Sequence, residues 1–373
     1  MRRVKREKLR EAKRIVIKVG TSSITYPTGQ IDLGKMERMA RELADLHNSG
    51  REILLVSSGA VGAGVGKLGR MPANLPEKQA MAAVGQALLM QMYEKFFSEY
   101  SKTIAQILLT RDCFSDPGRY LNSRNTIFTL LDYGVIPIVN ENDTVAVEEL
   151  KFGDNDRLSA MVACNAGADL LIILSDIDGL YDADPRIHPR ARLIPEVATV
   201  TEAMEAASTT RGSSMSSGGM ATKLSAARMT MANGIPMVIA SGSAPGAVRR
   251  IASGEELGTY FVPARDGYTA RRQWLAVGST PKGAFIVDAG AEEALLRQGG
   301  SLLPSGVTRV EGEFVAGDVV SVRGASGEIA RGVSNYASED ARRIIGRHSG
   351  EIASILGACD FDELIHRNNM ALV

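Results

Sequence analysis

The sequence predicts an α/β protein: a three-layer αβα sandwich with a mostly parallel central sheet, followed by a small β-rich C-terminal domain. From Arg14 to about Gly242, short β-branched runs alternate with longer amphipathic runs, as in a parallel sheet that helices cover on both faces. Between Phe261 and Arg272 the pattern changes to short strand-like runs separated by Gly and Pro. The length of 373 residues suits two domains, at about 150 residues each.

The elements of the first part follow one another in a regular order. Leu33, Met36, Ala40 and Leu43 recur at helical spacing and predict a helix over 33–47. Asn74 and Glu77 stand three residues apart, like a capping pair at the start of a helix over 74–100. Strand-like runs occupy 14–20, 51–59, 103–110, 135–140, 169–176 and 235–242, and two more helices are expected after GDNDRLSA (153–160) and after Gly219.

The second part has a different texture. Its strand-like runs are WLAVG (274–278), GAFIVDAG (283–290), VTRVEG (307–312), GDVVSVRG (317–324) and EIARGVSNY (328–336). We therefore predict three segments along the chain. They are a basic N-terminal arm (1–13), an α/β domain (14–265), and a linker with the β-rich domain (266–373, core about 274–357).

Composition excludes several classes of protein. The 43 Lys and Arg balance the 43 Asp and Glu, so no global field attracts nucleic acid or an anionic membrane. We find no run of about 18 apolar residues and no apolar segment behind the basic N-terminus, which predicts a cytoplasmic protein without membrane contact. Cys113, Cys164 and Cys359 form no CxxC pair and the four histidines form no HExxH, so zinc chemistry is not expected.

Six polar loops follow predicted strands or open predicted helices. They are KVGTSS (18–23), SSGAVGAG (57–64), NENDTVA (140–146), GDNDRLSA (153–160), SDIDGLYDADPR (175–186) and SSGGMATK (216–223). Open α/β sheets bind ligands at the carboxyl ends of their strands. These loops are therefore the predicted site.

The chemistry of these loops indicates phosphoryl transfer. Lys18 and Lys223 lie in glycine-rich segments whose backbone N–H groups can approach an anion. The third and fourth loops contain four acids and three amides, which could bind an ammonium group or magnesium, or orient the lysines: Glu141, Asp143, Asp154, Asp156, Asn140, Asn142 and Asn155. Phosphoryl transfer depends mainly on positioning and charge neutralisation. A carboxylate acceptor is already ionised at neutral pH, so no histidine base is needed.

One string resembles a dinucleotide fingerprint without meeting its requirements. GVGKLG (64–69) matches GxGxxG, but the preceding strand ends near Val56 and position 84 is valine instead of an acidic residue. The Walker pattern fails because Leu68 follows Lys67. A nicotinamide enzyme and a P-loop enzyme are therefore not expected.

In this order the motifs resemble those of the amino-acid kinase family, and within it the glutamate 5-kinase branch. KVGTS, SSGAVGAG, LLTRDCF, YLNSRNT, VIPIVNENDTVA, KFGDNDRLSA, LSDIDGLYDADPR and GGMATK carry the resemblance, from Ile15 to about Gly242. The part from about Trp274, through SLLPSGV and GDVVSV to GVSNYAS, is similar to a PUA domain. The resemblance implies ATP- and Mg²⁺-dependent phosphorylation of the γ-carboxylate of L-glutamate to L-glutamyl 5-phosphate, the first step of proline biosynthesis, with inhibition by L-proline.

The resemblance also implies roles for individual residues. Lys18 and Lys223 would contact the transferring phosphate, and Asp156 would hold these lysines. Glutamate would be bound by Ser58, Asp143 and Asn155, with Asp154 and Asn140 close by. The nucleotide would lie against Lys18, Gly20, Ser175, Asp176, Ser217, Gly218, Gly219, Met220, Ala221, Thr222 and Lys223. No residue is assigned to the metal.

Two other functions remain open at this stage. The chain could be a kinase of the same fold for aspartate, acetylglutamate, carbamate or a nucleoside monophosphate. It could also bind RNA through the PUA domain, but Arg272–Val373 contains ten basic and 13 acidic residues, a net charge of −3, whereas RNA-binding modules usually show a basic stripe. RNA binding is therefore not expected. A homo-oligomer and channelling of product to a glutamyl-phosphate reductase are expected from the resemblance alone.

Overall fold

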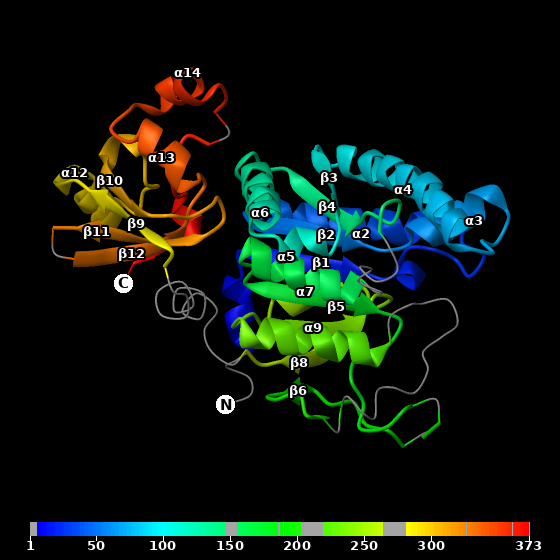
Figure 1. The fold of residues 1–373 in the computed structure, drawn as a ribbon. Helices are drawn as coiled ribbons and strands as arrows, with labels where there is room; N and C mark the ends of the chain where they lie inside the picture. Colours follow the sequence, from blue (N-terminus) through cyan, green and yellow to red (C-terminus); the bar gives the residue numbers. More distant parts are fainter. Residues whose placement is uncertain are drawn as a thin grey trace. The chain divides into compact units, whose positions relative to one another are not determined.

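The structure is a computed structural model. It describes residues 6–146, 155–185, 187–188, 190–202, 204, 219–263, 281–325, 327–359 and 361–372. The chain divides into two compact units, Met1–Phe114 with Arg124–Gly267 and Ser115–Ser123 with Tyr268–Val373, and each has its own sheet (Figure 1). Among the described helices, none combines the length and the apolar character that crossing a membrane requires.

The sheet of the first unit has eight strands in the order β3-β4-β2-β1-β5-β7-β8-β6. Their bounds are β1 (Arg14–Val19), β2 (Glu52–Ser57), β3 (Ile104–Leu109), β4 (Ile136–Glu141), β5 (Leu170–Ser175), β6 (Glu196–Val197), β7 (Met237–Ser241) and β8 (Thr259–Phe261). All neighbours are parallel except β7 and β8. The mostly parallel sheet is thus confirmed. Because the strand order reverses around β1, the rule for open sheets places a ligand at its carboxyl end.

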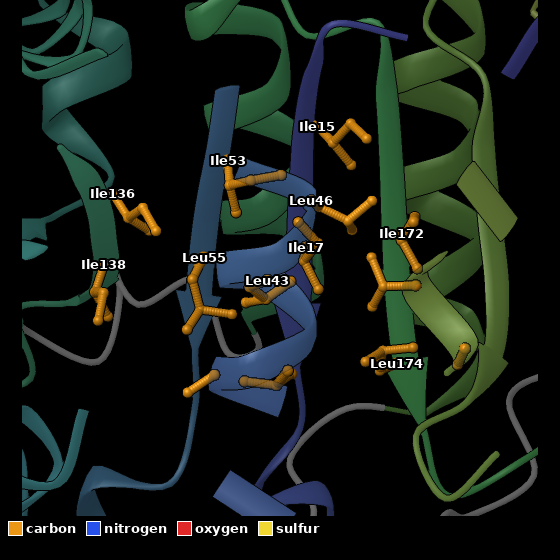
Figure 2. Close-up of a cluster of buried hydrophobic side chains, with 14 of the residues drawn as sticks. Ile15, Ile17, Leu43, Leu46, Ile53, Leu55, Ile136, Ile138, Ile172 and Leu174 are labelled. Atoms are coloured by element: carbon orange, nitrogen blue, oxygen red, sulfur yellow. The ribbon is translucent and has the colours of Figure 1, made fainter. Parts of the chain in front are cut away.

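Helices cover both faces of this sheet (Figure 1). Their bounds are α2 (Leu33–Asn48), α3 (Ala60–Leu68), α4 (Leu75–Ser98), α5 (Asp112–Ser115), α6 (Pro117–Asp132), α7 (Asn155–Ala166), α9 (Met220–Ala232) and α10 (Ala247–Ala252). One core packs the sheet against α2, α4 and α10, and the other packs it against α7 and α9. Figure 2 shows the first core, where Leu43 and Leu46 of α2 lie against isoleucines and leucines of β4, β2, β1 and β5. These two cores join the sheet to the helix layers on its two faces, so the first unit is a three-layer αβα sandwich.

The alternation of side chains along each strand decides which face a site residue meets. In β1, Ile15 and Ile17 belong to the α2/α4 core and Val16 belongs to the α7/α9 core. Successive residues of a strand point to opposite faces, so Lys18 shares the side of Val16. By the same parity, Ser57 shares the α4 side with Leu55.

Several local features of the sequence fix the helices. Asn74 accepts a hydrogen bond from the Glu77 N–H at 2.9 Å, while the Glu77 carboxylate accepts one from the Ala73 N–H at 2.9 Å, which confirms the capping pair. The helix expected after GDNDRLSA begins inside that motif, at Asn155. This earlier start places Asn155 and Asp156 in its first turn, where the backbone N–H groups favour negative charge.

The basic N-terminal segment is folded where the structure describes it. Arg6 is 5% exposed and donates to the carbonyls of Pro195, Leu257 and Gly258 at 2.7–3.0 Å. Leu9 and Ala12 are buried in the α2/α4 core. Residues 6–13 are therefore an integral part of the first unit.

The second unit is built on a five-stranded sheet in the order β10-β9-β11-β12-β13. Its elements are β9 (Gly283–Val287), α12 (Ala289–Glu293), β10 (Val307–Gly312), β11 (Val319–Gly324), β12 (Gly327–Val333), α13 (Ser338–Ile344), α14 (Ile352–Leu356) and β13 (Met370–Leu372). Phe285 and Phe314 pack edge to face in its core, with their ring centroids 5.5 Å apart. The predicted run 274–278 lies outside the described residues. The rest confirms a small β-rich C-terminal domain.

Gly64, in the GVGKLG string, and Gly85 allow two helices to pack closely. A Cβ atom on Gly64 of α3 would lie 2.0 Å from the Met81 carbonyl oxygen of α4, and one on Gly85 of α4 would lie 1.7 Å from the Ala60 carbonyl oxygen of α3. Real Cβ atoms do not approach so closely, so both glycines are needed for α3 and α4 to pack at this distance.

We therefore expect Gly85→Ala to force α3 and α4 apart and to destabilise the protein by roughly 1–3 kcal/mol, the usual cost of overpacking. Thermal unfolding followed by circular dichroism measures this loss. Gly118→Ala is the matched control, because its Cβ would meet only the Asp116 side chain, at 3.4 Å. An unfolding midpoint of Gly85→Ala equal to that of the control would contradict the packing argument.

Candidate active site

Two lysines and one aspartate meet at the carboxyl end of β1. Lys18 Nζ lies 2.7 Å from Asp156 Oδ1, and Lys223 Nζ lies 3.1 Å from Asp156 Oδ2. Lys18 comes from β1, Asp156 from the first turn of α7 and Lys223 from the first turn of α9. The strand parity that turns Lys18 toward α7 and α9 thus explains how residues so distant in sequence come together.

This cluster is deeply buried, and its three named side chains are two ammonium groups and one carboxylate. Asp156 is 0% exposed, and Lys18 and Lys223 are 4% and 5% exposed. Burying a charge is costly unless it is paired, and here each carboxylate oxygen has one ammonium group. Two buried ammonium groups at the carboxyl end of a strand would stabilise the negative charge of an anion such as a phosphate group.

Thr222 extends the cluster toward the glycine-rich start of α9. Its hydroxyl lies 2.9 Å from Asp156 Oδ2 and 2.8 Å from the Gly219 carbonyl oxygen. Gly219 is the residue before α9, and Met220 and Ala221 form its first turn. Thr222 therefore fixes this helix start against Asp156.

A second group of predicted residues forms a network of amides. Asn155 Nδ2 donates to the Ser57 carbonyl at 2.7 Å and to Asn140 Oδ1 at 2.8 Å. Asn140 Oδ1 also accepts from the Glu141 N–H at 2.9 Å. Asn140 and Asn155 are 3% and 8% exposed, so these bonds are shielded from water. The network connects the ends of β2 and β4 with the first turn of α7.

The loop that carries Ser58 is fixed against β1. The Ser58 N–H donates to the Val19 carbonyl at 3.1 Å. Gly59 has φ +97°, in the left-handed region that favours glycine, and it precedes α3. The half-buried Ser58 therefore lies between the ends of β1 and β2, close to where Lys18 ends its strand.

Asp143 lies on the loop after β4. This loop is joined to β3 because the Asn142 N–H donates to the Leu109 carbonyl at 2.9 Å, and it turns back where the Ala146 N–H donates to the Asn142 carbonyl at 3.0 Å. Asp143 is half-buried. Asp154, the other predicted acid near glutamate, lies outside the described residues.

The predicted nucleotide residues that the structure describes lie at the end of β1, at the end of β5 and at the start of α9. Gly20 follows β1, and a Cβ atom there would lie 3.7 Å from Lys18 Nζ. Ser175 ends β5, its hydroxyl donates to Asp176 at 3.0 Å, and its carbonyl accepts from the Gly242 N–H at 2.8 Å. Ser217 and Gly218 lie outside the described residues. Within the described ranges, no group of three or more acidic, histidine or cysteine side chains could hold a metal.

The structure also shows polar residues near the site that the sequence prediction missed. Gln86 of α4 accepts from Asn140 Nδ2 at 2.7 Å, and the Tyr93 hydroxyl lies 2.8 Å from Ser57 Oγ. Tyr93 is 0% exposed, and burial raises the pKa of its hydroxyl above the usual range. Gln86 and Tyr93 stand seven residues apart in one helix, and this spacing was the only signal in the sequence that could have found them.

Comparisons with known proteins agree with the fold. The model of the amino acid kinase family matches residues 13–241, and the PUA domain model matches residues 283–356. The chain is 54% identical over 372 residues to the glutamate 5-kinase of Carboxydothermus hydrogenoformans, covering 99% of this chain and 100% of that protein. It is 52% identical over 368 residues to the glutamate 5-kinase of Moorella thermoacetica, covering 98% and 97%. With a family model over more than half of its length and relatives that align from end to end, the chain belongs to the amino acid kinase family and, within it, to the glutamate 5-kinases.

Proposed function

We propose that this protein transfers the γ-phosphate of ATP to the γ-carboxylate of L-glutamate and forms L-glutamyl 5-phosphate. The observation that carries the proposal is the buried Lys18–Asp156–Lys223 cluster beside the Asn140–Asn155 amide pair. The first group suits a phosphate and the second suits a small polar acceptor. The end-to-end relatives named glutamate 5-kinase support this choice of acceptor.

The residues of the cluster would act by neutralising charge. A carboxylate oxygen of glutamate attacks the γ-phosphorus, and the bond from phosphorus to the bridging oxygen of ADP breaks. The acceptor is ionised at neutral pH, so no proton must be removed. Lys18 and Lys223 would lower the barrier by stabilising the charge on the phosphoryl oxygens as it moves. Asp156 would be a positioning residue, because each of its oxygens is already engaged by a lysine.

The amide pair would orient the acceptor. Asn155 uses both hydrogens of its amide within the protein, one on the Ser57 carbonyl and one on Asn140. Its carbonyl oxygen is then the group offered to a ligand, and a carbonyl oxygen accepts hydrogen bonds only. The α-ammonium group of glutamate has three donors and meets that requirement. Ser58 and Asp143 would complete the contacts to glutamate from the loops after β2 and β4.

Magnesium would enter with ATP, because this ion commonly binds substrate phosphates together with one or two carboxylates. It would neutralise part of the triphosphate charge. We assign no side chain to it. Ser175, Asp176, Gly219, Met220, Ala221 and Thr222 would line the nucleotide, with Gly20 allowing close approach at the end of β1.

We place ATP and glutamate binding in residues 14–265 and assign no step of the reaction to the PUA domain, residues 266–373 with the linker. In the second unit, Arg309 and Arg323 each lie within 3.3 Å of Glu311, and Arg331 pairs with Glu328 at 2.8 Å. Arginines that already have carboxylate partners make a weak phosphate-binding stripe. A role in RNA binding is therefore not proposed. A cytoplasmic homo-oligomer that passes its product to a glutamyl-phosphate reductase remains a further expectation.

Removing either lysine should slow the chemical step. We expect Lys18→Ala and Lys223→Ala to lower kcat by about 10²- to 10³-fold, the scale of one lost electrostatic stabiliser, with a smaller effect on the KM for glutamate. ADP release with glutamate as the acceptor measures both constants. Lys95→Ala, an exposed lysine on α4, is the matched control. A near-normal kcat in either variant would remove that lysine from the proposed role.

Glutamate and proline should share part of one site, because both present an α-carboxylate and a positively charged amine. Asp143→Ala should raise the KM for glutamate and the inhibition constant for proline together, each by roughly 10- to 100-fold for a lost charged hydrogen bond. Initial rates at varied glutamate and proline test this. The exposed Asp132, changed to Ala, is the control. Unchanged inhibition with a raised KM would place the inhibitor elsewhere.

A fragment of residues 1–265 should fold and phosphorylate glutamate, because every residue assigned to the reaction lies before this boundary. The fragment keeps residues 1–13 because Leu9 and Ala12 belong to its core. Circular dichroism establishes folding first, and ADP release then measures activity. A folded fragment without kinase activity would mean that the second domain completes the active site.

A further inference from the structure

Three polar side chains form a stripe along α4, and each one holds a different part of the proposed acceptor site. Gln79 Nε2 donates to the Ala146 carbonyl at 3.2 Å, Gln86 Oε1 accepts from Asn140 Nδ2 at 2.7 Å, and the Tyr93 hydroxyl lies 2.8 Å from Ser57 Oγ. Residues seven apart lie on nearly the same side of an α-helix, two turns and about 10.5 Å from one another. We call Gln79, Gln86 and Tyr93 the α4 stripe.

The α4 stripe lies on the opposite face of the sheet from the phosphate cluster. Ser57 and Asn140 turn toward α4 by strand parity, together with Leu55 and Ile138. Asn155 belongs to α7, which covers the other face. The hydrogen bond between Asn140 and Asn155 crosses the carboxyl edge of the sheet. Asn155 directly precedes Asp156 in the chain. Gln86 is therefore connected to the acceptor site and to the start of the helix that carries Asp156.

Backbone groups fix the direction of every hydrogen bond in this chain of amides. The Glu141 N–H can only donate, so the atom of Asn140 that it meets must be the carbonyl oxygen. The nitrogen of Asn140 then faces Gln86, which must present its own oxygen. At the other end, the Ser57 carbonyl can only accept, so Asn155 must present its nitrogen. The side chain at position 86 must therefore present a hydrogen-bond acceptor to the nitrogen of Asn140.

We propose that Gln86 is a positioning residue for the acceptor substrate. It holds the Asn140 amide in the orientation that accepts one hydrogen of Asn155, while the Ser57 carbonyl accepts the other. The carbonyl oxygen of Asn155 is thereby kept for the substrate ammonium group. Gln79 and Tyr93 hold the loops on either side. The inference rests on the proposed function, because it concerns the site for glutamate.

The test compares acceptor and non-acceptor side chains at position 86. Gln86→Met keeps the length of the side chain and leaves the Asn140 N–H₂ group without its partner. We expect the KM for glutamate to rise about tenfold, with the KM for ATP unchanged. Gln86→Glu keeps an oxygen acceptor and should return the KM for glutamate to within about threefold of the parent value. Gln91→Met, an exposed glutamine of the same helix, should change neither constant.

The possible outcomes separate the inference from the proposed function. A parent enzyme without glutamate kinase activity would overturn both. An active parent with an unchanged KM for glutamate in Gln86→Met, or equal losses in Gln86→Met and Gln86→Glu, would overturn the inference alone. If Gln86→Met does not fold, Gln79→Met is tested instead, because it removes the hydrogen bond to the Ala146 carbonyl. We expect it to raise the KM for glutamate severalfold and to leave the KM for ATP unchanged. An unchanged KM there overturns it.

Discussion

The rest of the site depends on one electrostatic constraint, the burial of Asp156 between two lysines. A carboxylate with no exposed surface is tolerated only when its charge is compensated, and loss of one partner of a buried pair commonly costs about 3–5 kcal/mol. Its partners come from β1 and α9, while Asp156 begins α7. The ion cluster therefore fixes one strand and two helices relative to each other. In the proposed function the same two lysines would stabilise a phosphate group, so the interaction that orders these elements would also place the ammonium groups of the site.

The pleat of the strands divides the site between the two faces of the sheet. Lys18 turns to the α7/α9 side, whereas Ser57 and Asn140 turn to the α4 side. In the proposed function, the phosphate site and the acceptor site are built on opposite faces and would meet at the strand ends. The hydrogen bond between Asn140 and Asn155 is made there. The in-line transfer of a phosphoryl group needs donor and acceptor to be placed together, and this bond joins their two supports.

Sequence patterns predicted the fold and the meeting of Lys18, Asp156 and Lys223, for physical reasons. Strand and helix periodicities are local, and polar loops after parallel strands must share one edge, so Lys18, Asp156 and Lys223 could be expected to meet. Two features could not be predicted in this way. One is the start of α7 inside GDNDRLSA, and the other is the contact between Gln86 and Asn140, which are 54 residues apart. A glutamine in a helix is predicted to be solvent-exposed unless the strand that it faces is known. The GVGKLG string was ambiguous for the same reason, since Gly64 is explained by the facing backbone of α4 and Gly66 by the backbone of Gly29 and Gln30.

The described contacts in the two halves of the site are of different kinds: ion pairs at Asp156, and hydrogen bonds between neutral amides at Asn140 and Asn155. Neutral amides have distinct donor and acceptor ends, so they discriminate between ligands by the direction of the hydrogen bond. With both hydrogens of Asn155 engaged, an acceptor molecule without a donor at that point would make no hydrogen bond to the Asn155 carbonyl oxygen. In the proposed function, the lysines would therefore select the phosphate, and the fixed order of amides would select an amino acid over a simple carboxylic acid.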